Sequence, residues 1–157
     1  MQSVRIALPG RAQVFRDAAM PALNLRYLAA IILLDGKLDL VSAQSLERMH
    51  GDASVRAWMA RVEVVHDPAQ EAPPGAPRTE SARVVLALEG GAHHEVYVPF
   101  VRGYPSHPMS QADVEQKALE LMAPRLGEQC ARRVVEAVAA LERMPAAGEL
   151  VTLIASA

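Results

Sequence analysis

The sequence predicts an α+β fold: an antiparallel sheet of about four strands with helices on one face, followed by a helical C-terminal extension. Apolar and polar residues alternate over residues 4–8 and again around 62–65, which is the period of half-buried strands. Two further β-rich runs flank the pair Gly90-Gly91, and only helical patterns follow that hairpin. We therefore expect an α+β domain over residues 1–103 and a helical extension over residues 104–157.

Local signals place the first elements. The first strand is stopped by a Pro-Gly pair, and a nearly all-apolar helix then follows Asn24, a good cap residue. Asp35-Gly36 closes that helix. We expect a second helix over residues 41–49 and a third that starts at Asp52, whose carboxylate can cap it.

The middle of the chain predicts a loop and a hairpin. Residues 68–80 are rich in proline and polar side chains, so no regular element is expected there. The runs 83–88 and 95–101 predict two strands joined through Gly90-Gly91, because glycine supplies the positive φ angles that a hairpin turn needs.

Helices account for the C-terminal extension. Ser110 and Asp113 have the spacing of a capping box and predict a helix behind them. A second helix carries apolar residues at helical intervals over residues 130–141 and is ended by Pro145. Residues 149–154 predict a last turn or two.

Composition excludes several classes of protein. The 157 residues fit one ordinary domain, and 16 basic against 18 acidic side chains give no excess of positive charge for a nucleic acid. The longest apolar run, residues 28–34, is far shorter than the ~20 residues that span a membrane. Cys130 is the one cysteine, so no internal disulfide forms. We expect a cytoplasmic protein with neither a nucleic acid nor a membrane as partner.

No spacing in this chain specifies a reaction by itself: phosphate loops, nucleophile elbows and metal-ligand clusters are all missing from the sequence. His93 and Glu95 could share a metal because alternate strand residues face one side, but a polar hairpin surface is the interpretation we favour. His50 and His107 occupy loops, where a histidine is either catalytic or simply solvated.

Tyr27 stands apart because it lies in the first turn of the most apolar helix. Its ring is expected to be held firmly, while its hydroxyl needs a polar partner or a cavity. From the residues alone, a core tyrosine bonded to a backbone acceptor is favoured over a functional hydroxyl.

Two stretches together resemble a known family. Residues 20–36, MPALNLRYLAAIILLDG, are similar to the "FSLPYAVAAALLDG" segment of the MmgE/PrpD family, and residues 101–110 resemble its "GDPENPLS" segment. The helix over residues 114–127 resembles the pattern that follows in the family, and residues 52–56 and 62–67 fall in the expected order. This family includes 2-methylcitrate dehydratase, cis-aconitate decarboxylase and iminodisuccinate epimerase.

The resemblance implies that this chain corresponds to the family's α+β lid and its returning helices. It implies proton removal next to a carboxylate of a small polycarboxylate, with dehydration, decarboxylation or epimerisation, carried out by side chains without a metal or cofactor. Tyr27 matches the family's lid tyrosine and is the candidate catalytic residue. Arg26, which can meet a carboxylate bidentately, and His107, in the second matching segment, are the candidate substrate-binding residues.

The resemblance also implies a partner, because the family's N-terminal helical domain has no counterpart in this sequence. We expect a helical N-terminal-type subunit or domain on which the extension 104–157 packs, in a homo- or hetero-oligomer. The first hypothesis is therefore the C-terminal half of a lyase or isomerase that is inactive alone. The alternative is a non-catalytic relic, or a regulatory or dimerisation module, with the same fold.

Overall fold

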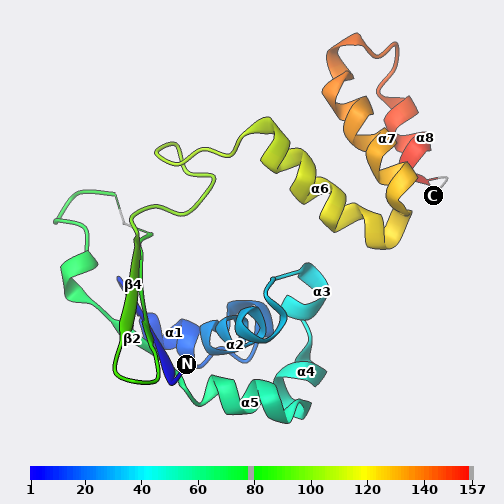
Figure 1. Ribbon diagram of the computed structural model, residues 1–157. Coiled ribbons are helices and arrows are strands. Elements are labelled where there is room, and N and C mark those ends of the chain that lie inside the picture. Colours follow the sequence, from blue (N-terminus) through cyan, green and yellow to red (C-terminus); the bar gives the residue numbers. More distant parts are fainter. Residues whose placement is uncertain (78–79, 156–157) are drawn as a thin grey trace. The chain divides into compact units, whose positions relative to one another are not determined.

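The computed structural model describes residues 1–77 and 80–155 of the chain, which form two compact units, Met1–His107 and a second unit from Pro108 on. Figure 1 shows their helices and strands. The first unit contains β1 (Ser3–Leu8), α1 (Ala12–Arg16), η1 (Pro21–Leu23), α2 (Leu25–Asp35), α3 (Leu40–Ala43), α4 (Leu46–Gly51), α5 (Ala53–Met59), β2 (Val62–His66), η2 (Pro68–Gln70), β3 (Ala82–Ala87) and β4 (His93–Val98). The second contains α6 (Gln111–Leu126), α7 (Glu128–Ala139), η3 (Leu141–Arg143) and α8 (Gly148–Ala155).

The predicted α+β fold class is confirmed, with one change in the sheet. Its four strands have the order β2-β1-β3-β4, and the pairs β1–β3 and β3–β4 are antiparallel. The pair β1–β2 is parallel, with Val4 opposite Val62. A parallel pair needs a long crossover connection, and the helices from α1 to α5 provide it. The sheet is therefore mixed, where the sequence alone predicted an antiparallel one.

Helices cover one face of the sheet. Val4 and Ile6 of β1 and Val62 and Val64 of β2 are buried there against α1 and α2. The opposite face carries charged side chains, among them the ion pair of Arg5 with Glu63, and this alternation is why the strands form with one fixed face inward. A second buried cluster lies on another side of α2, against α4 and α5.

Several predicted boundaries shift for local reasons. The helix predicted over residues 41–49 is wrong as one element, because the Ser45 hydroxyl caps a new helix, α4, and separates it from α3. The strand predicted over residues 95–101 ends at Val98, because Pro99 has no N–H to donate to a ladder. The loop predicted over residues 68–80 contains the short η2, in which the Asp67 carboxylate accepts a hydrogen bond from the backbone N–H of Ala69.

The strongest local signals are confirmed. Gly36 ends α2 with a φ of 71°, and Asp52 accepts hydrogen bonds from the backbone N–H groups of Ser54 and Val55 at the start of α5. Ser110 and Asp113 form the predicted capping box of α6. Among the helices of the described residues, none is long and apolar enough to cross a bilayer.

Candidate functional site

Tyr27 is fixed by the first turn of α2. The Asn24 side chain caps this helix: its Oδ1 accepts a hydrogen bond from the Tyr27 backbone N–H at 3.1 Å. The Nδ2 of Asn24 donates to the Ala18 carbonyl at 2.8 Å, so the cap is tied to the preceding turn. Tyr27 therefore starts the helix with little freedom, and its ring is fully buried beside Ile31 and Val55.

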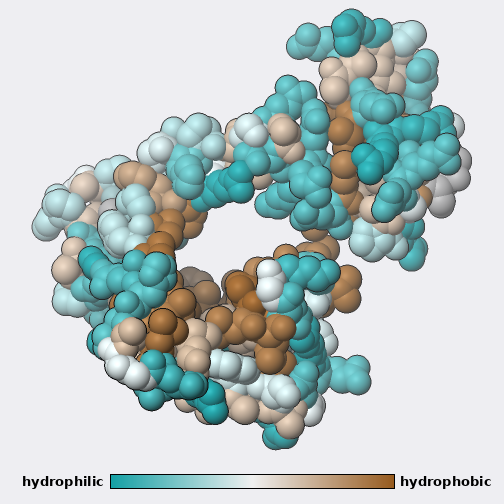
Figure 2. Space-filling view, in the orientation of Figure 1, coloured by the Kyte–Doolittle hydropathy of each residue, from teal (hydrophilic) through white to brown (hydrophobic). Residues whose placement is uncertain are grey.

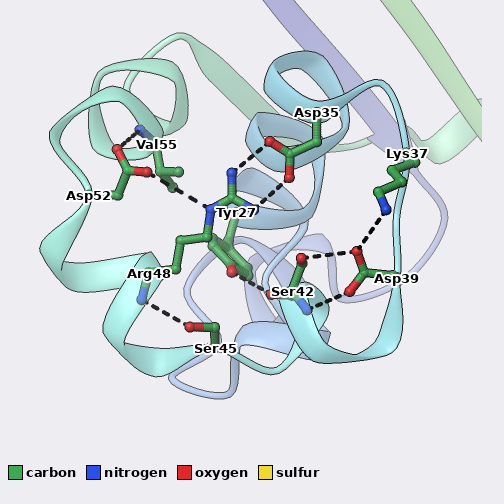
Figure 3. Close-up of polar contacts among 9 residues, drawn as sticks. All are labelled: Tyr27, Asp35, Lys37, Asp39, Ser42, Ser45, Arg48, Asp52 and Val55. Atoms are coloured by element: carbon green, nitrogen blue, oxygen red, sulfur yellow. Dashed lines mark hydrogen bonds and ion pairs between the residues drawn. The ribbon is translucent and has the colours of Figure 1, made fainter. Parts of the chain in front are cut away.

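The hydroxyl of Tyr27 has a backbone partner. It donates to the Ser42 carbonyl oxygen at 2.5 Å, and Figure 3 shows the hydroxyl and the Ser42 carbonyl facing one another. Burial raises the pKa of the Tyr27 hydroxyl above its usual value, although the positive charge of Arg48 opposes that rise. The phenol thus stays protonated at neutral pH, and it can donate a hydrogen bond but cannot act as a base.

The Ser42 carbonyl is held by the α3 turn. Asp39 caps this turn: its Oδ1 accepts from the Ser42 N–H at 2.8 Å, and its Oδ2 accepts from the Ser42 hydroxyl at 3.1 Å. These hydrogen bonds, the one from the backbone N–H first, lower the pKa of the Asp39 carboxyl. Lys37 lies 3.8 Å from the same carboxylate. The acceptor of the Tyr27 hydroxyl is therefore part of a well-bonded turn.

An ion pair joins α2 to α4 beside this turn. The Arg48 guanidinium donates to both carboxylate oxygens of Asp35, at 2.5 and 2.7 Å, which is the bidentate geometry favoured by arginine. The pairing lowers the pKa of the Asp35 carboxyl and raises that of Arg48. Asp52 approaches Arg48 at 3.9 Å. We call Tyr27, Asp35, Asp39, Ser42 and Arg48 the Tyr27 cluster (Figure 3).

The sequence points to Tyr27 but not to the other members of the Tyr27 cluster. Asp35 was interpreted only as part of a helix stop, although a carboxylate placed at a helix C-terminus, where the macrodipole disfavours negative charge, signals a need for a cation. Arg48 follows the Ser45 cap by one turn, but nothing in the sequence pairs it with a carboxylate 13 positions earlier. The Ser42 carbonyl carries no sequence signal at all.

Among the described residues, no contact joins Arg26 or His107 to the Tyr27 hydroxyl. The Nε of Arg26 donates to the Met59 carbonyl at 3.0 Å and so connects α2 to the end of α5. His107 lies in the exposed loop after β4, where its Nδ1 is 3.3 Å from the Phe100 carbonyl oxygen. Its backbone pairs with that of Tyr104.

Of the other histidines considered, His50 lies in α4, where the sequence predicted a loop, and His93 lies in β4 of the sheet. His93 and Glu95 share one face of β4, but Glu95 is engaged in an ion pair with Arg83 of the neighbouring strand. Across residues 1–77 and 80–155, no three His, Cys, Asp or Glu side chains are grouped as a metal ion would require. In this structure, His93 and Glu95 therefore form part of a polar hairpin surface.

Comparison with known proteins assigns the chain to a family. No curated protein matches it. A family model does: residues 9–143 match the MmgE/PrpD C-terminal domain. The match runs from the turn after β1 to the end of η3 and contains Tyr27, Arg26 and His107. The chain belongs to the MmgE/PrpD family and corresponds to its C-terminal domain.

Proposed function

We propose that this chain is the C-terminal half, a lid with its returning helices, of a metal-independent lyase or isomerase that acts on small polycarboxylates. The reaction class is removal of a proton next to a carboxylate, followed by loss of water or carbon dioxide or by inversion. Membership of the family over residues 9–143 is the observation that carries this proposal. The complete enzyme, including its N-terminal half, determines the substrate and which of these outcomes follows proton removal.

The second unit supports the need for a helical partner. A groove of about 340 Å³ between α6 and α7 is lined almost entirely by apolar atoms. Its walls include Val114, Met122, Val134 and Val138, and both Val114 and Val138 are 53% exposed. Figure 2 shows hydrophobic side chains gathered along α7. Contiguous exposed apolar surface of this kind marks an interaction site, and a helical N-terminal-type domain fits it.

Tyr27 is the proposed catalytic residue. Proton removal next to a carboxylate develops negative charge on oxygen, and a neutral phenol can stabilise that charge by donating a hydrogen bond. The raised pKa of Tyr27 favours this role over that of a base. For the hydroxyl to reach a substrate, it exchanges its bond to the Ser42 carbonyl for one to the substrate oxygen. The α3 turn therefore moves aside when a substrate is bound.

Arg26 and His107 are the proposed carboxylate-binding residues. The Nε of Arg26 is used on the Met59 carbonyl, which leaves its two terminal nitrogens for a carboxylate. His107 is exposed and reaches a backbone carbonyl only through Nδ1. Both belong to the two segments that resemble segments of the family, and the helical partner supplies the remaining acid/base groups.

One observation favours the alternative, a non-catalytic regulatory or dimerisation module with the same fold. Tyr27 is fully buried, and its hydroxyl is satisfied by a backbone acceptor in the way of an ordinary core tyrosine. In that case its contribution is to hold the α3 turn, and substitution changes stability rather than catalysis.

Reconstitution separates the two functions. The chain is combined with a helical N-terminal half of the family, and turnover of a panel of small di- and tricarboxylates is measured. We expect the chain alone to be inactive, the mixture to be active, and Tyr27→Phe to lower kcat by at least about a hundredfold. Tyr104→Phe, an exposed tyrosine in the loop after β4, is the matched control and should keep full activity.

Two results would contradict the proposal. Turnover by the chain without a partner would show that no second half is needed. A reconstituted Tyr27→Phe enzyme with unchanged kcat and a lowered thermal midpoint would assign Tyr27 a purely structural role.

A further inference from the structure

Arginine side chains from separate segments of the chain line one groove of the first unit. The groove has a volume of about 480 Å³. Arg16 is the last residue of α1, Arg26 lies in the first turn of α2, and Arg61 lies in the turn between α5 and β2. We call this the arginine groove. The described residues that line it include no member of the Tyr27 cluster, so the two are separate places on the first unit.

Only part of the positive charge in the arginine groove is neutralised within the chain. A fourth arginine, Arg5 of β1, has its Nε 3.4 Å from Glu63, which lines the groove as well. The Nε and Nη2 of Arg16 donate to the carboxylate of Asp17 at 2.7–3.1 Å. These two arginines therefore have carboxylate partners.

Arg26 has no such partner. Its Nε donates to the Met59 carbonyl at 3.0 Å, and its terminal nitrogens have no acceptor among the described residues. The pKa of Asp17 is lowered by its hydrogen bonds to Arg16 first, and the charge of Arg26 adds a smaller effect. Arg26 thus lies close enough to Arg16 to share its surroundings, but its own charge is not paired.

Arg61 is the second unpaired cation of the groove. Its guanidinium carbon lies 5.0 Å from the centroid of the Trp58 ring, and among the ion pairs of the described residues it has no carboxylate. A neutral contact therefore orients each unpaired guanidinium: a carbonyl holds Arg26, and an aromatic ring holds Arg61. A cation that is already held in place loses less side-chain entropy when it binds an anion.

We propose that the arginine groove binds a small anion with at least two negative charges, carried by carboxylate or phosphate groups. The guanidinium groups of Arg26 and Arg61 donate to its oxygens, as arginine does to both kinds of group, and Arg16 adds positive charge beside them. The volume of the groove lies in the range of about 300–1,000 Å³ that is usual for small-molecule sites. A chain with a net charge of −2 thus keeps a local excess of positive charge at this place.

Binding is measured by isothermal titration calorimetry on the full chain at a constant ionic strength of about 0.15 M. Citrate and inorganic phosphate are the probes, and acetate is the monovalent control. We expect citrate or phosphate to saturate the chain and to bind at least about tenfold more tightly than acetate, because only they carry enough charge for both cations. The tighter of the two identifies the group that the groove prefers.

Trp58 fluorescence locates the bound anion. Trp58 is the one tryptophan of the chain and lies against Arg61, so its emission should change with the same saturation curve as the heat. An anion that saturates the calorimetric signal without changing this emission would be bound elsewhere and would overturn the proposal.

Substitutions test which cations hold the anion. Arg61→Gln and Arg26→Gln should each weaken binding about tenfold, because each removes a charge-assisted contact. Arg56→Gln is the matched control, since it removes the same charge from an exposed position of α5 outside the groove. It should change the affinity by less than about twofold, because salt screens exposed charges that are far apart.

Three results would overturn the proposal: no saturable binding of either probe, an unchanged affinity in Arg61→Gln, or an equal loss in Arg56→Gln, which would reduce the binding to general surface charge. Arg26 is also a proposed substrate residue, so Arg61 tests this inference independently. Because no turnover is measured, normal anion binding by a chain that stays inactive with a helical half would refute the proposed function alone.

Discussion

The two units bury their apolar side chains to different extents. In the first unit, one buried cluster packs α2 against the sheet and another packs it against α4 and α5. In the described part of the second unit, Ala131 and Val134 are the buried residues, while Val138 and Val151 are more than half exposed. The first unit therefore has a core of its own, whereas the second presents its apolar residues outward.

This difference shows what helical periodicity can and cannot predict. The apolar spacing of α7 identifies the side chains that share a face, and the structure places α6 and α8 beside that helix. Two neighbours do not cover the whole face, since Val138 stays 53% exposed. A helical pattern thus predicts which face of a helix is buried, but it does not predict which element or which chain packs against that face.

The largest expected effect comes from the same substitution made in each unit. Ile31→Ala, at a fully buried position of α2, should lower the free energy of unfolding by about 2–5 kcal/mol. Ile154→Ala, at a position of α8 that is 45% exposed, should change it by less than about 0.5 kcal/mol. Urea unfolding measures both, with Trp58 fluorescence reporting the first unit and helical circular dichroism reporting the whole chain. Equal losses in the two variants would show that the second unit has a core after all.

A glycine pair should give effects of opposite sign. Gly36 has a φ of 71°, so Gly36→Ala strains the end of α2 and should cost about 1 kcal/mol. Gly148 begins α8 without a positive φ and with open space around its Cα, so Gly148→Ala should stabilise that helix by about 0.5–1 kcal/mol. Thermal melts followed by circular dichroism test both changes. A loss of stability in Gly148→Ala would contradict the assignment of α8.

The smallest expected effect concerns acid. The hydrogen bonds from Arg48 lower the pKa of Asp35 below its ordinary value of 3.8, so this pair stabilises the folded state fully above about pH 4. As the pH falls further, the unfolded chain takes up the proton first, and the stabilisation is lost on the way to the folded-state pKa. We therefore measure the melting temperature by Trp58 fluorescence as a function of pH. Below about pH 4 it should fall less steeply in Asp35→Asn than in the wild type. If the melting temperatures of the two proteins fell equally steeply with pH, the ion pair of Asp35 with Arg48 would contribute nothing to stability.

Features encoded within one turn of chain were predictable from the sequence. The Asp52 cap, the Gly36 helix end and the Ser110–Asp113 capping box depend on neighbours one to three positions away, and all three are present. The short helix α1 was missed, because its five residues have no side-chain cap and too little length for a period to show.

Features that depend on distant partners were not predictable. The parallel pairing of β1 with β2 follows from the path of the helices between them, which no local pattern specifies. The predicted site shows the same limit: the ring of Tyr27 was expected to be fixed, but the identity of its acceptor, the Ser42 carbonyl, depends on how the α3 turn folds back.

The pairing of Val4 with Val62 has a consequence for synthesis of the chain. A ribosome that adds about 5–20 residues per second needs roughly 3–12 s to make the intervening segment. Throughout that time, β1 has been made but neither of its neighbours has, since β3 is made later still. Of the four strands, the interior strand β1 is therefore made before both of its neighbours, and its apolar face stays uncovered by the sheet until they follow.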